Sequence, residues 1–267
     1  MNIHETAIVS PGAEISEDVE IGPCTVIGEN VRIGKNTRIG AHSIIEGNTE
    51  IGENNDISHF VTIGAPPQDI GYKGEGTRVV IGNNNTIREY TTIHRATTKQ
   101  DWVTIIGNEN YLMSYTHVAH DCSLGNKIIM VNAATLGGHT SVGDHVTLSS
   151  FIASHQFVRI GAYAFVSGVS GLPRDIPPYM MSSGIRANLH GLNLVGLRRH
   201  GFSREAITGL RKAYRIIWRE SSLLKDGIKR VKEEMEPFPE LDVLMDFITT
   251  DSPRGIARGS KSKEEDL

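Results

Sequence analysis

The chain has 267 residues, with 27 lysines and arginines against 31 aspartates and glutamates, and its formal net charge is −4 at pH 7. This near balance indicates no nucleic-acid partner and no polybasic membrane contact. The first residues lack a basic segment followed by an apolar stretch, and no run of about eighteen apolar residues occurs, so we expect a cytoplasmic protein without stable membrane insertion. The two cysteines, Cys24 and Cys122, are too few for a disulfide framework or a cysteine metal site.

An aliphatic residue recurs at every sixth position along most of the chain. The series covers residues 3–63 without a gap, then 81–93, and then 106–172, where Ser154 is its one polar member. Such spacing fits neither an amphipathic helix nor an alternating strand, and it is typical of a hexapeptide β-helix whose short strands meet at turns. Three hexapeptides make one coil, so residues eighteen apart should lie about 4.8 Å from each other on neighbouring coils. We therefore predict a mainly β fold, with a parallel β-helix over residues 1–187.

Two segments interrupt the series, at residues 64–80 and 94–105. The first is rich in proline and glycine, and the second is shorter and more polar. Long loops on a regular scaffold are commonly where ligands bind, although a simply tolerated insertion explains them equally well at this point.

Residues 188–250 change to helical periodicity. A first helix is predicted to begin after Ser203 as N-cap, and a second follows from about Leu223. The segment "PFPE" at 237–240 separates these from a final short helix. The apolar positions of the first two helices are Ile207, Leu210, Tyr214, Ile217, Leu223, Ile228, Val231 and Met235. We expect residues 251–267 to form a polar, flexible tail.

Histidines gather in the second half of the repeat region, at His94, His117, His120, His139 and His155. Because Gly138 follows His120 by eighteen residues, its backbone amide should stack beside the His120 side chain on the next coil. An imidazole beside a free N–H suits acyl transfer, since the ring can take a proton from an attacking hydroxyl and the N–H can stabilise the oxyanion. Asp121 would orient the ring. Two alternatives stay open: a zinc site like that of γ-class carbonic anhydrases, and a non-catalytic structural β-helix with solvated histidines.

Several longer motifs resemble the UDP-N-acetylglucosamine acyltransferase family of lipid A biosynthesis. They are "PPQDIGYKGEGT" at 66–77, "TIHRAT" at 92–97, "THVAHDC" at 116–122, "ATLGGH" at 134–139, "SHQFVRIGAYAFVSGVSG" at 154–171 and "GLRRHGFSREAI" at 196–207. The resemblance implies a left-handed parallel β-helix followed by a C-terminal α-helical domain, assembled as a homotrimer with sites in the clefts between subunits. It implies transfer of a (3R)-3-hydroxyacyl group from acyl carrier protein to the 3-position of UDP-N-acetylglucosamine, the first step of lipid A biosynthesis. The acyl group arrives on the carrier's phosphopantetheine, so neither a further cofactor nor a metal is expected.

The resemblance also assigns roles to residues. His120 matches the general base, Asp121 its partner and Gly138 the oxyanion donor. The substrate-binding positions are Gln68, Asp69, Lys73, His94, His117, His139, His155, Gln156, Asn193 and Arg199. The acyl-chain groove is assigned to Phe165 and Gly168, where a glycine floor leaves room for a long chain.

Three positions depart from the family pattern. The lysine of the first loop falls on Gly71, with Lys73 close by, a glutamate of the nucleotide-binding segment falls on Val195, and the second of two arginines falls on His200. Whether the acceptor carries a 3-hydroxyl or a 3-amino group is left open, because both would use the same base and oxyanion donor.

A row of arginines offers a docking surface for an acidic carrier protein. Arg204, Arg211, Arg215 and Arg219 fall on one face of a regular helix. A solvated face whose arginines pair with Glu205 and Glu220 is the competing interpretation.

Overall fold

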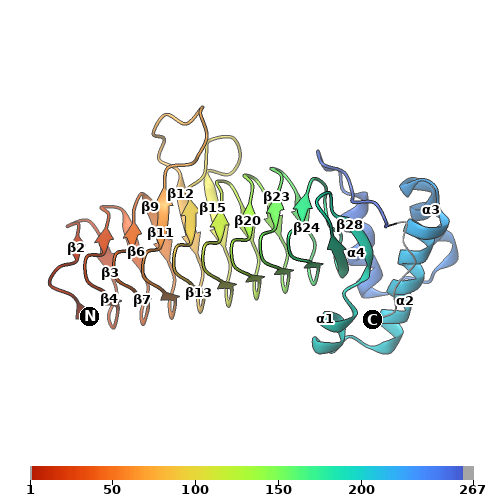
Figure 1. The fold of residues 1–267 in the computed structure, drawn as a ribbon, viewed down its shortest axis with the longest axis horizontal. Helices are drawn as coiled ribbons and strands as arrows, with labels where there is room; N and C mark the ends of the chain where they lie inside the picture. Colours follow the sequence, from red (N-terminus) through yellow and green to blue (C-terminus); the bar gives the residue numbers. More distant parts are fainter. Residues whose placement is uncertain (1, 261–267) are drawn as a thin grey trace.

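The computed structural model describes residues 2–260 and shows an elongated solenoid that ends in a helical domain (Figure 1). Short strands stack into three parallel sheets, so each coil contributes one strand to each sheet. The first sheet contains β1 (Asn2–Ile3), β4 (Glu20–Ile21), β7 (Arg38–Ile39), β10 (Asp56–Ile57), β13 (Thr86–Ile87), β16 (Tyr111–Leu112), β19 (Ile129–Met130), β22 (Thr147–Leu148), β25 (Phe165–Val166), β27 (Met180–Ser183) and β28 (Asn188–Leu192), the last pairing antiparallel with β27.

The second sheet contains β2 (Ile8–Val9), β5 (Val26–Ile27), β8 (Ile44–Ile45), β11 (Thr62–Ala65), β14 (Thr92–His94), β17 (His117–Val118), β20 (Thr135–Leu136), β23 (Ala153–Ser154) and β26 (Gly171–Leu172). The third contains β3 (Glu14–Ile15), β6 (Val31–Ile33), β9 (Asn48–Ile51), β12 (Arg78–Ile81), β15 (Val103–Ile106), β18 (Ser123–Leu124), β21 (Ser141–Val142) and β24 (Arg159–Ile160). The predicted left-handed parallel β-helix is confirmed.

The six-residue series forms the core. Ile27 pairs in register with Ile45, both are fully buried, and the same aliphatic stacking continues along the solenoid. The polar member, Ser154, also has a structural role: its hydroxyl accepts a hydrogen bond from the Gly137 N–H at 3.0 Å and lies 2.9 Å from Thr140 Oγ1. A hydroxyl is tolerated there because it satisfies a backbone donor that would otherwise stay unpaired.

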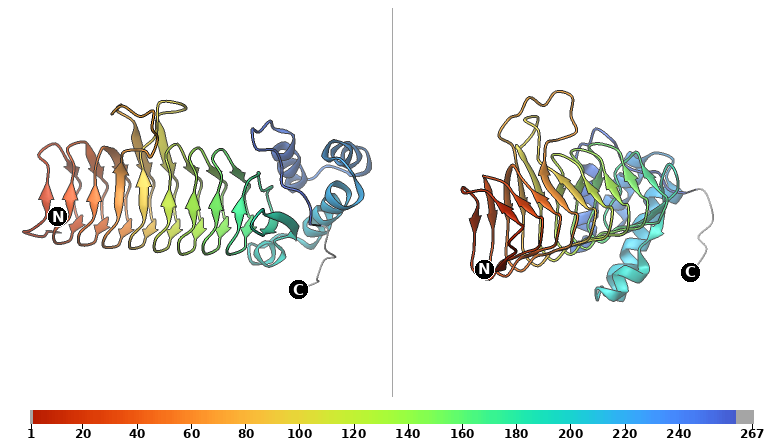
Figure 2. Two further views of the ribbon diagram at one scale, coloured as in Figure 1. Left: turned by 45° about the horizontal axis from the view of Figure 1, so that its top comes forward. Right: turned by 60° about the vertical axis from the view of Figure 1, so that its left-hand side comes forward.

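Both interruptions leave the solenoid at the same corner, between the second and third sheets (Figure 2). The first begins at Gly64, whose φ of +83° and contact with the Glu46 carbonyl leave no room for a side chain. The neighbouring strands keep their register in spite of the insertions, because β12 pairs residue by residue with β9 on one side and with β15 on the other. The loops are therefore additions to a continuous scaffold, and no coil is lost.

The C-terminal domain contains α1 (Leu194–Arg199), α2 (Arg204–Tyr214), the π-helix η1 (Arg215–Glu220), α3 (Leu224–Glu234) and α4 (Pro239–Thr249). Ser203 caps α2 as predicted, since its side chain accepts a hydrogen bond from the Ala206 N–H. Leu210, Tyr214 and Ile217 are buried, as their spacing indicated. No helix within residues 2–260 is long and apolar enough to cross a membrane.

Two predicted boundaries were wrong. Helices begin only at Leu194, because residues 188–192 form β28 and complete a hairpin with β27. Residues 255–260 are not a flexible tail: Ile256 forms a parallel bridge with Asp175, and Gly259 forms one with Leu189. The last part of the predicted tail, residues 261–267, lies outside the described residues.

The regular helix assumed for the row of four arginines ends at Tyr214. A π-helix replaces the α-helix after Tyr214, and the last two arginines are engaged within the chain. Arg219 stacks on the Tyr214 ring and donates to the Ser260 carbonyl, whereas Arg215 pairs with Glu220 at 3.0 Å. Arg204 and Arg211 remain as exposed cations of α2.

Candidate active site

Five successive coils bring polar residues to the corner between the second and third sheets, which we call the loop corner. The two loops occupy the first two coils, between β11 and β12 and between β14 and β15. The next three coils contribute His120–Asp121, Gly138–His139 and His155–Phe157. The repeat thus aligns residues from distant parts of the sequence along one edge of the molecule.

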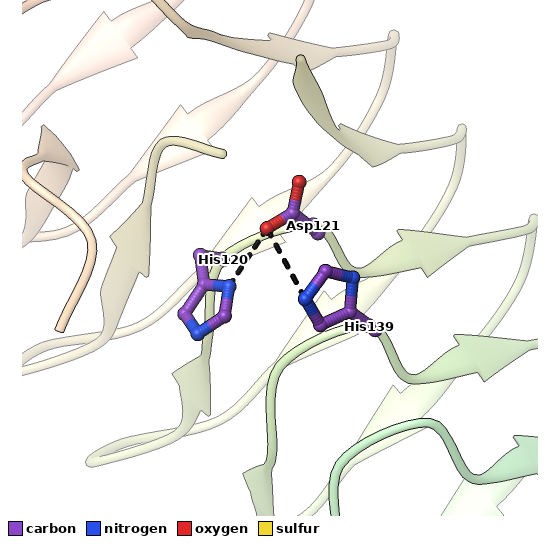
Figure 3. A group of neighbouring side chains, drawn as sticks. All are labelled: His120, Asp121 and His139. Carbon is purple, nitrogen blue, oxygen red and sulfur yellow. Dashed lines mark hydrogen bonds and ion pairs between the residues drawn. The ribbon is translucent and has the colours of Figure 1, made fainter. Parts of the chain in front are cut away.

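His120 and Asp121 form a buried hydrogen-bonded pair (Figure 3). His120 Nδ1 lies 2.7 Å from Asp121 Oδ2, and the two residues are 3% and 7% exposed. The same oxygen accepts hydrogen bonds from the Thr97 N–H at 3.0 Å and the Thr97 hydroxyl at 2.8 Å. Burial disfavours the ionised carboxylate, but the hydrogen bonds from His120 and Thr97 outweigh it and lower the pKa of Asp121. An ionised Asp121 accepts the Nδ1 proton of His120, which leaves Nε2 free to accept a proton from a substrate.

Gly138 packs directly against the His120 ring. A Cβ at this position would lie 2.6 Å from Nε2 and 3.0 Å from Nδ1, so only glycine leaves room for the imidazole. Within residues 2–260 the Gly138 N–H donates no hydrogen bond, whereas its carbonyl accepts one from the Phe157 N–H at 3.0 Å. The stacking of Gly138 on His120 predicted from the eighteen-residue spacing is confirmed. The N–H of Gly138 is thus a free backbone donor next to the imidazole.

His139 links the corner to the second loop. Its Nε2 lies 3.7 Å from Asp121 Oδ2, and its Nδ1 lies 2.7 Å from Gln100 Oε1. The ring stacks on Phe157, with centroids 4.3 Å apart and planes 5° from parallel. Burial lowers the pKa of His139, which favours the neutral ring. Figure 3 shows both imidazoles directed at the same oxygen of Asp121.

His94 and His117 lie side by side on the second sheet, next to this corner. Their ring centroids are 4.9 Å apart, and His117 Nδ1 lies 2.7 Å from Thr92 Oγ1. His94 Nδ1 is buried and has no partner within residues 2–260. Burial lowers the pKa of His94 to about 4 and also lowers that of His117, so both are neutral at pH 7. A neutral imidazole with a free nitrogen can exchange hydrogen bonds with a polar substrate.

The first loop contributes a carboxylate whose partner was not foreseen. Asp69 Oδ2 lies 2.5 Å from Lys99 Nζ of the second loop, and Asp69 Oδ1 accepts a hydrogen bond from the Gly71 N–H at 2.7 Å. The Lys99 ammonium, and then the Gly71 N–H, lower the pKa of Asp69. Lys73, the predicted cation of this region, is exposed, and within residues 2–260 its side chain has no ion-pair partner. Gln68 is exposed beside Asp69.

The remaining predicted substrate contacts lie further from His120 within one chain. His155 and Gln156 are exposed at the loop corner one coil beyond Gly137. Asn193 caps α1, since its Oδ1 accepts from the Gly196 N–H and its Nδ2 donates to the Tyr163 carbonyl at 2.9 Å. Arg199 is exposed at the end of α1, beyond the last coil (Figure 1). A nucleotide role for these side chains stays a prediction.

Phe165 and Gly168 do not reach the loop corner of their own chain. Phe165 lies in β25 of the first sheet, and Gly168 is exposed at the corner that follows it, against Ser149 and Ser150. This strand is three coils beyond β16, the strand that begins the coil of His120. The offset along the axis is therefore about 14 Å.

His120, Asp121 and His139 are also the one group of possible metal ligands found within residues 2–260. Two ligands of a tetrahedral zinc ion, with bonds of about 2.0–2.1 Å, lie about 3.3 Å apart. The 2.7 Å between His120 Nδ1 and Asp121 Oδ2 is instead a hydrogen-bond distance, and the same oxygen is already bonded to Thr97. The arrangement fits an oriented base better than a zinc ligand set.

Comparisons with known proteins agree with the fold and indicate the family. Residues 30–65 match the family model of the bacterial transferase hexapeptide, and residues 175–257 match that of domain 2 of UDP-N-acetylglucosamine O-acyltransferase. An acyl-(acyl-carrier-protein)–UDP-N-acetylglucosamine O-acyltransferase of Thermodesulfovibrio yellowstonii is 55% identical over 96% of this chain and 99% of its own length. One of Burkholderia orbicola is 50% identical over the same shares. The solved structure of a UDP-N-acetylglucosamine acyltransferase of Francisella novicida superposes with a TM-score of 0.93 at 39% identity, covering 97% of this chain and 95% of that one.

A hexapeptide solenoid with a histidine–aspartate pair packed against a corner glycine defines a hexapeptide-repeat acyltransferase. With relatives this similar over nearly the whole chain, the assignment can be narrower. The chain belongs to the family of acyl-(acyl-carrier-protein)–UDP-N-acetylglucosamine O-acyltransferases.

Proposed function

We propose that this protein transfers a (3R)-3-hydroxyacyl group from acyl carrier protein to the 3-position of UDP-N-acetylglucosamine, the first step of lipid A biosynthesis. The observation that carries the proposal is the position of the His120 ring between the Asp121 carboxylate and Gly138. Donor and acceptor follow from the names of the relatives. The phosphopantetheine of the carrier delivers the acyl group, and the chemistry requires neither another cofactor nor a metal.

The reaction follows from the hydrogen bonds of His120. Its Nε2 removes the proton of the acceptor hydroxyl while that oxygen attacks the thioester carbonyl. The negative charge that develops on the carbonyl oxygen is stabilised by the Gly138 N–H, and Asp121 stabilises the imidazolium through Nδ1–H. The tetrahedral intermediate then breaks its C–S bond, and the imidazolium returns the proton to the departing thiolate. The products are the acylated nucleotide sugar and the free carrier.

The working unit in this proposal is a homotrimer with sites between subunits. Phe165 and Gly168 lie on another edge and about 14 Å along the axis from the coil of His120, so one chain alone makes no continuous groove. A neighbouring copy that presents these residues to the loop corner would complete the groove, and Asn193 and Arg199 would then approach the nucleotide from that copy. The protein is proposed to act in the cytoplasm.

The test is acyl transfer by the purified protein. Mass spectrometry would follow the acylated sugar from (3R)-3-hydroxyacyl carrier protein with UDP-N-acetylglucosamine and, separately, with its 3-amino analogue. His120→Ala should lower the single-turnover rate by about 10²–10⁴ while the protein stays folded. His59→Ala, an exposed histidine at another corner, is the matched control. Near-normal transfer by folded His120→Ala would remove His120 as the base, and no transfer by the wild type with either acceptor would reject the function.

A further inference from the structure

The second loop wraps the catalytic pair from both of its ends. Thr97, near the start of the loop, donates its hydroxyl and its N–H to Asp121 Oδ2. Thr104, in the strand that follows, accepts the Asp121 N–H at 2.9 Å. Thr97 is 3% exposed, and within residues 2–260 the other carboxylate oxygen, Oδ1, is buried without a partner. The orientation of this carboxylate therefore depends on the contacts of Oδ2 alone.

We propose that Thr97 is a positioning residue that sets the tautomer and orientation of His120 through Asp121; the inference rests on the proposed acyl transfer. Thr97 Oγ1 accepts a hydrogen bond from the Lys99 N–H at 3.2 Å. Because the backbone N–H is the donor in that bond, the single hydroxyl proton of Thr97 is free to point at Asp121, 2.8 Å away.

The direction of each bond in this chain is then fixed. The Lys99 N–H donates to Thr97, the Thr97 hydroxyl donates to Asp121, and Asp121 accepts the Nδ1 proton of His120. A carboxylate held by two donors from one side keeps its Oδ2 facing the imidazole, so the proton stays on Nδ1 and the lone pair stays on Nε2. Nε2 is the nitrogen beside Gly138, where the acceptor hydroxyl must lose its proton.

The proposal gives the chain inserted at this coil a role in the site. The plain corners further along have six residues from one core aliphatic to the next, whereas the loop inserts chain between Ile93 and Ile106. Within this insertion, the Thr97 N–H and hydroxyl both reach Asp121 of the next coil. The second loop thus contributes to the catalytic apparatus through Thr97.

The experiment compares Thr97→Val, Thr97→Ser and Thr98→Val in steady-state acyl transfer. Thr97→Val keeps the side-chain shape and the backbone N–H but removes the hydroxyl proton, and we expect kcat to fall about 10- to 100-fold with little change in KM for either substrate. Thr97→Ser should retain most of the activity because it restores the hydroxyl. Thr98 is exposed on the same loop and has no side-chain hydrogen bond within residues 2–260, so Thr98→Val should behave as wild type.

A double-mutant cycle separates positioning from general stability. If Thr97 acts through Asp121, then Thr97→Val should have almost no further effect on kcat in an Asp121→Asn background. The proposal would be overturned if the losses in kcat of Thr97→Val and Asp121→Asn were additive in the double variant. It would also be overturned if Thr97→Val raised KM without changing kcat, or if Thr97→Ser were as inactive as Thr97→Val. Should Thr97→Val fail to fold, Thr97→Ala tested in the same cycle gives the same decision. A wild-type protein that transfers no acyl group rejects the proposed function, whereas an active wild type with an unaffected Thr97→Val rejects only this inference.

Discussion

Gly138→Ala is a one-carbon test of the contact between neighbouring coils. The new Cβ would lie 2.6 Å from His120 Nε2, whereas non-bonded carbon contacts are comfortable at about 3.5–4.0 Å, so the ring must retreat by about 1 Å. The φ of Gly138 is not in the left-handed region, so the backbone itself accepts alanine. Because the ring is bonded to Asp121 at 2.7 Å, a retreat also disturbs that hydrogen bond. A misplacement of about 1 Å costs on the order of 10²-fold in rate.

We therefore expect kcat for Gly138→Ala to fall about 100-fold, with KM values changed little and a stability loss of about 1–3 kcal/mol from overpacking. The assay is steady-state transfer with each substrate varied in turn, alongside urea unfolding. Gly76→Ala is the matched control, since its Cβ would meet only Asn48 Nδ2, at 3.6 Å. A folded Gly138→Ala enzyme within threefold of wild-type kcat would refute the claim that the ring and the glycine are in working contact.

Three further results are expected. The pKa of His94 is about 4 in the folded protein and about 6.5 in the unfolded chain, so the unfolded chain binds the proton first as the pH falls. The stabilisation that is present above about pH 6.5 is therefore lost as the pH falls toward 4. Urea unfolding should show that the free energy of unfolding falls by up to about 3 kcal/mol over this pH window, and His94→Gln should weaken this pH dependence. The same pH dependence in wild type and His94→Gln would contradict a role for His94. Lys99→Met should raise the KM for the nucleotide sugar about tenfold, because Asp69 loses its cation, whereas Lys73→Met should leave this KM unchanged. A larger effect of Lys73→Met than of Lys99→Met would identify Lys73 as the cation that acts with Asp69. A chelator of divalent metals should leave turnover unchanged, and a loss reversed by zinc would support a metal at His120.

The solenoid was predictable because one physical requirement repeats. Every sixth side chain must fill a narrow core, so the aliphatic series gave the strands, and its period placed Gly138 on His120. The helix after Ser203 was predictable for a similar reason, since a cap and an apolar stripe are local signals.

Thr97 and Lys99 were missed because the loops have no period. Their contacts with Asp121 and Asp69 join segments 24 and 30 residues apart, and no fixed spacing relates them. Residues 255–260 likewise gave no periodic signal of pairing with the solenoid, because their bridges are made by backbone groups, which every sequence carries.

The return of residues 255–260 to the last coils has a consequence for association between molecules. A β-helix is open at both ends, and each end presents unpaired strand edges on which another chain can stack. At the C-terminal end, Ile256 and Gly259 pair with Asp175 and Leu189, and the helical domain lies beyond them (Figure 1). A chain cut after residue 250 would keep the helical domain but lose both bridges, so the backbone groups of Asp175 and Leu189 would become available for pairing with another chain.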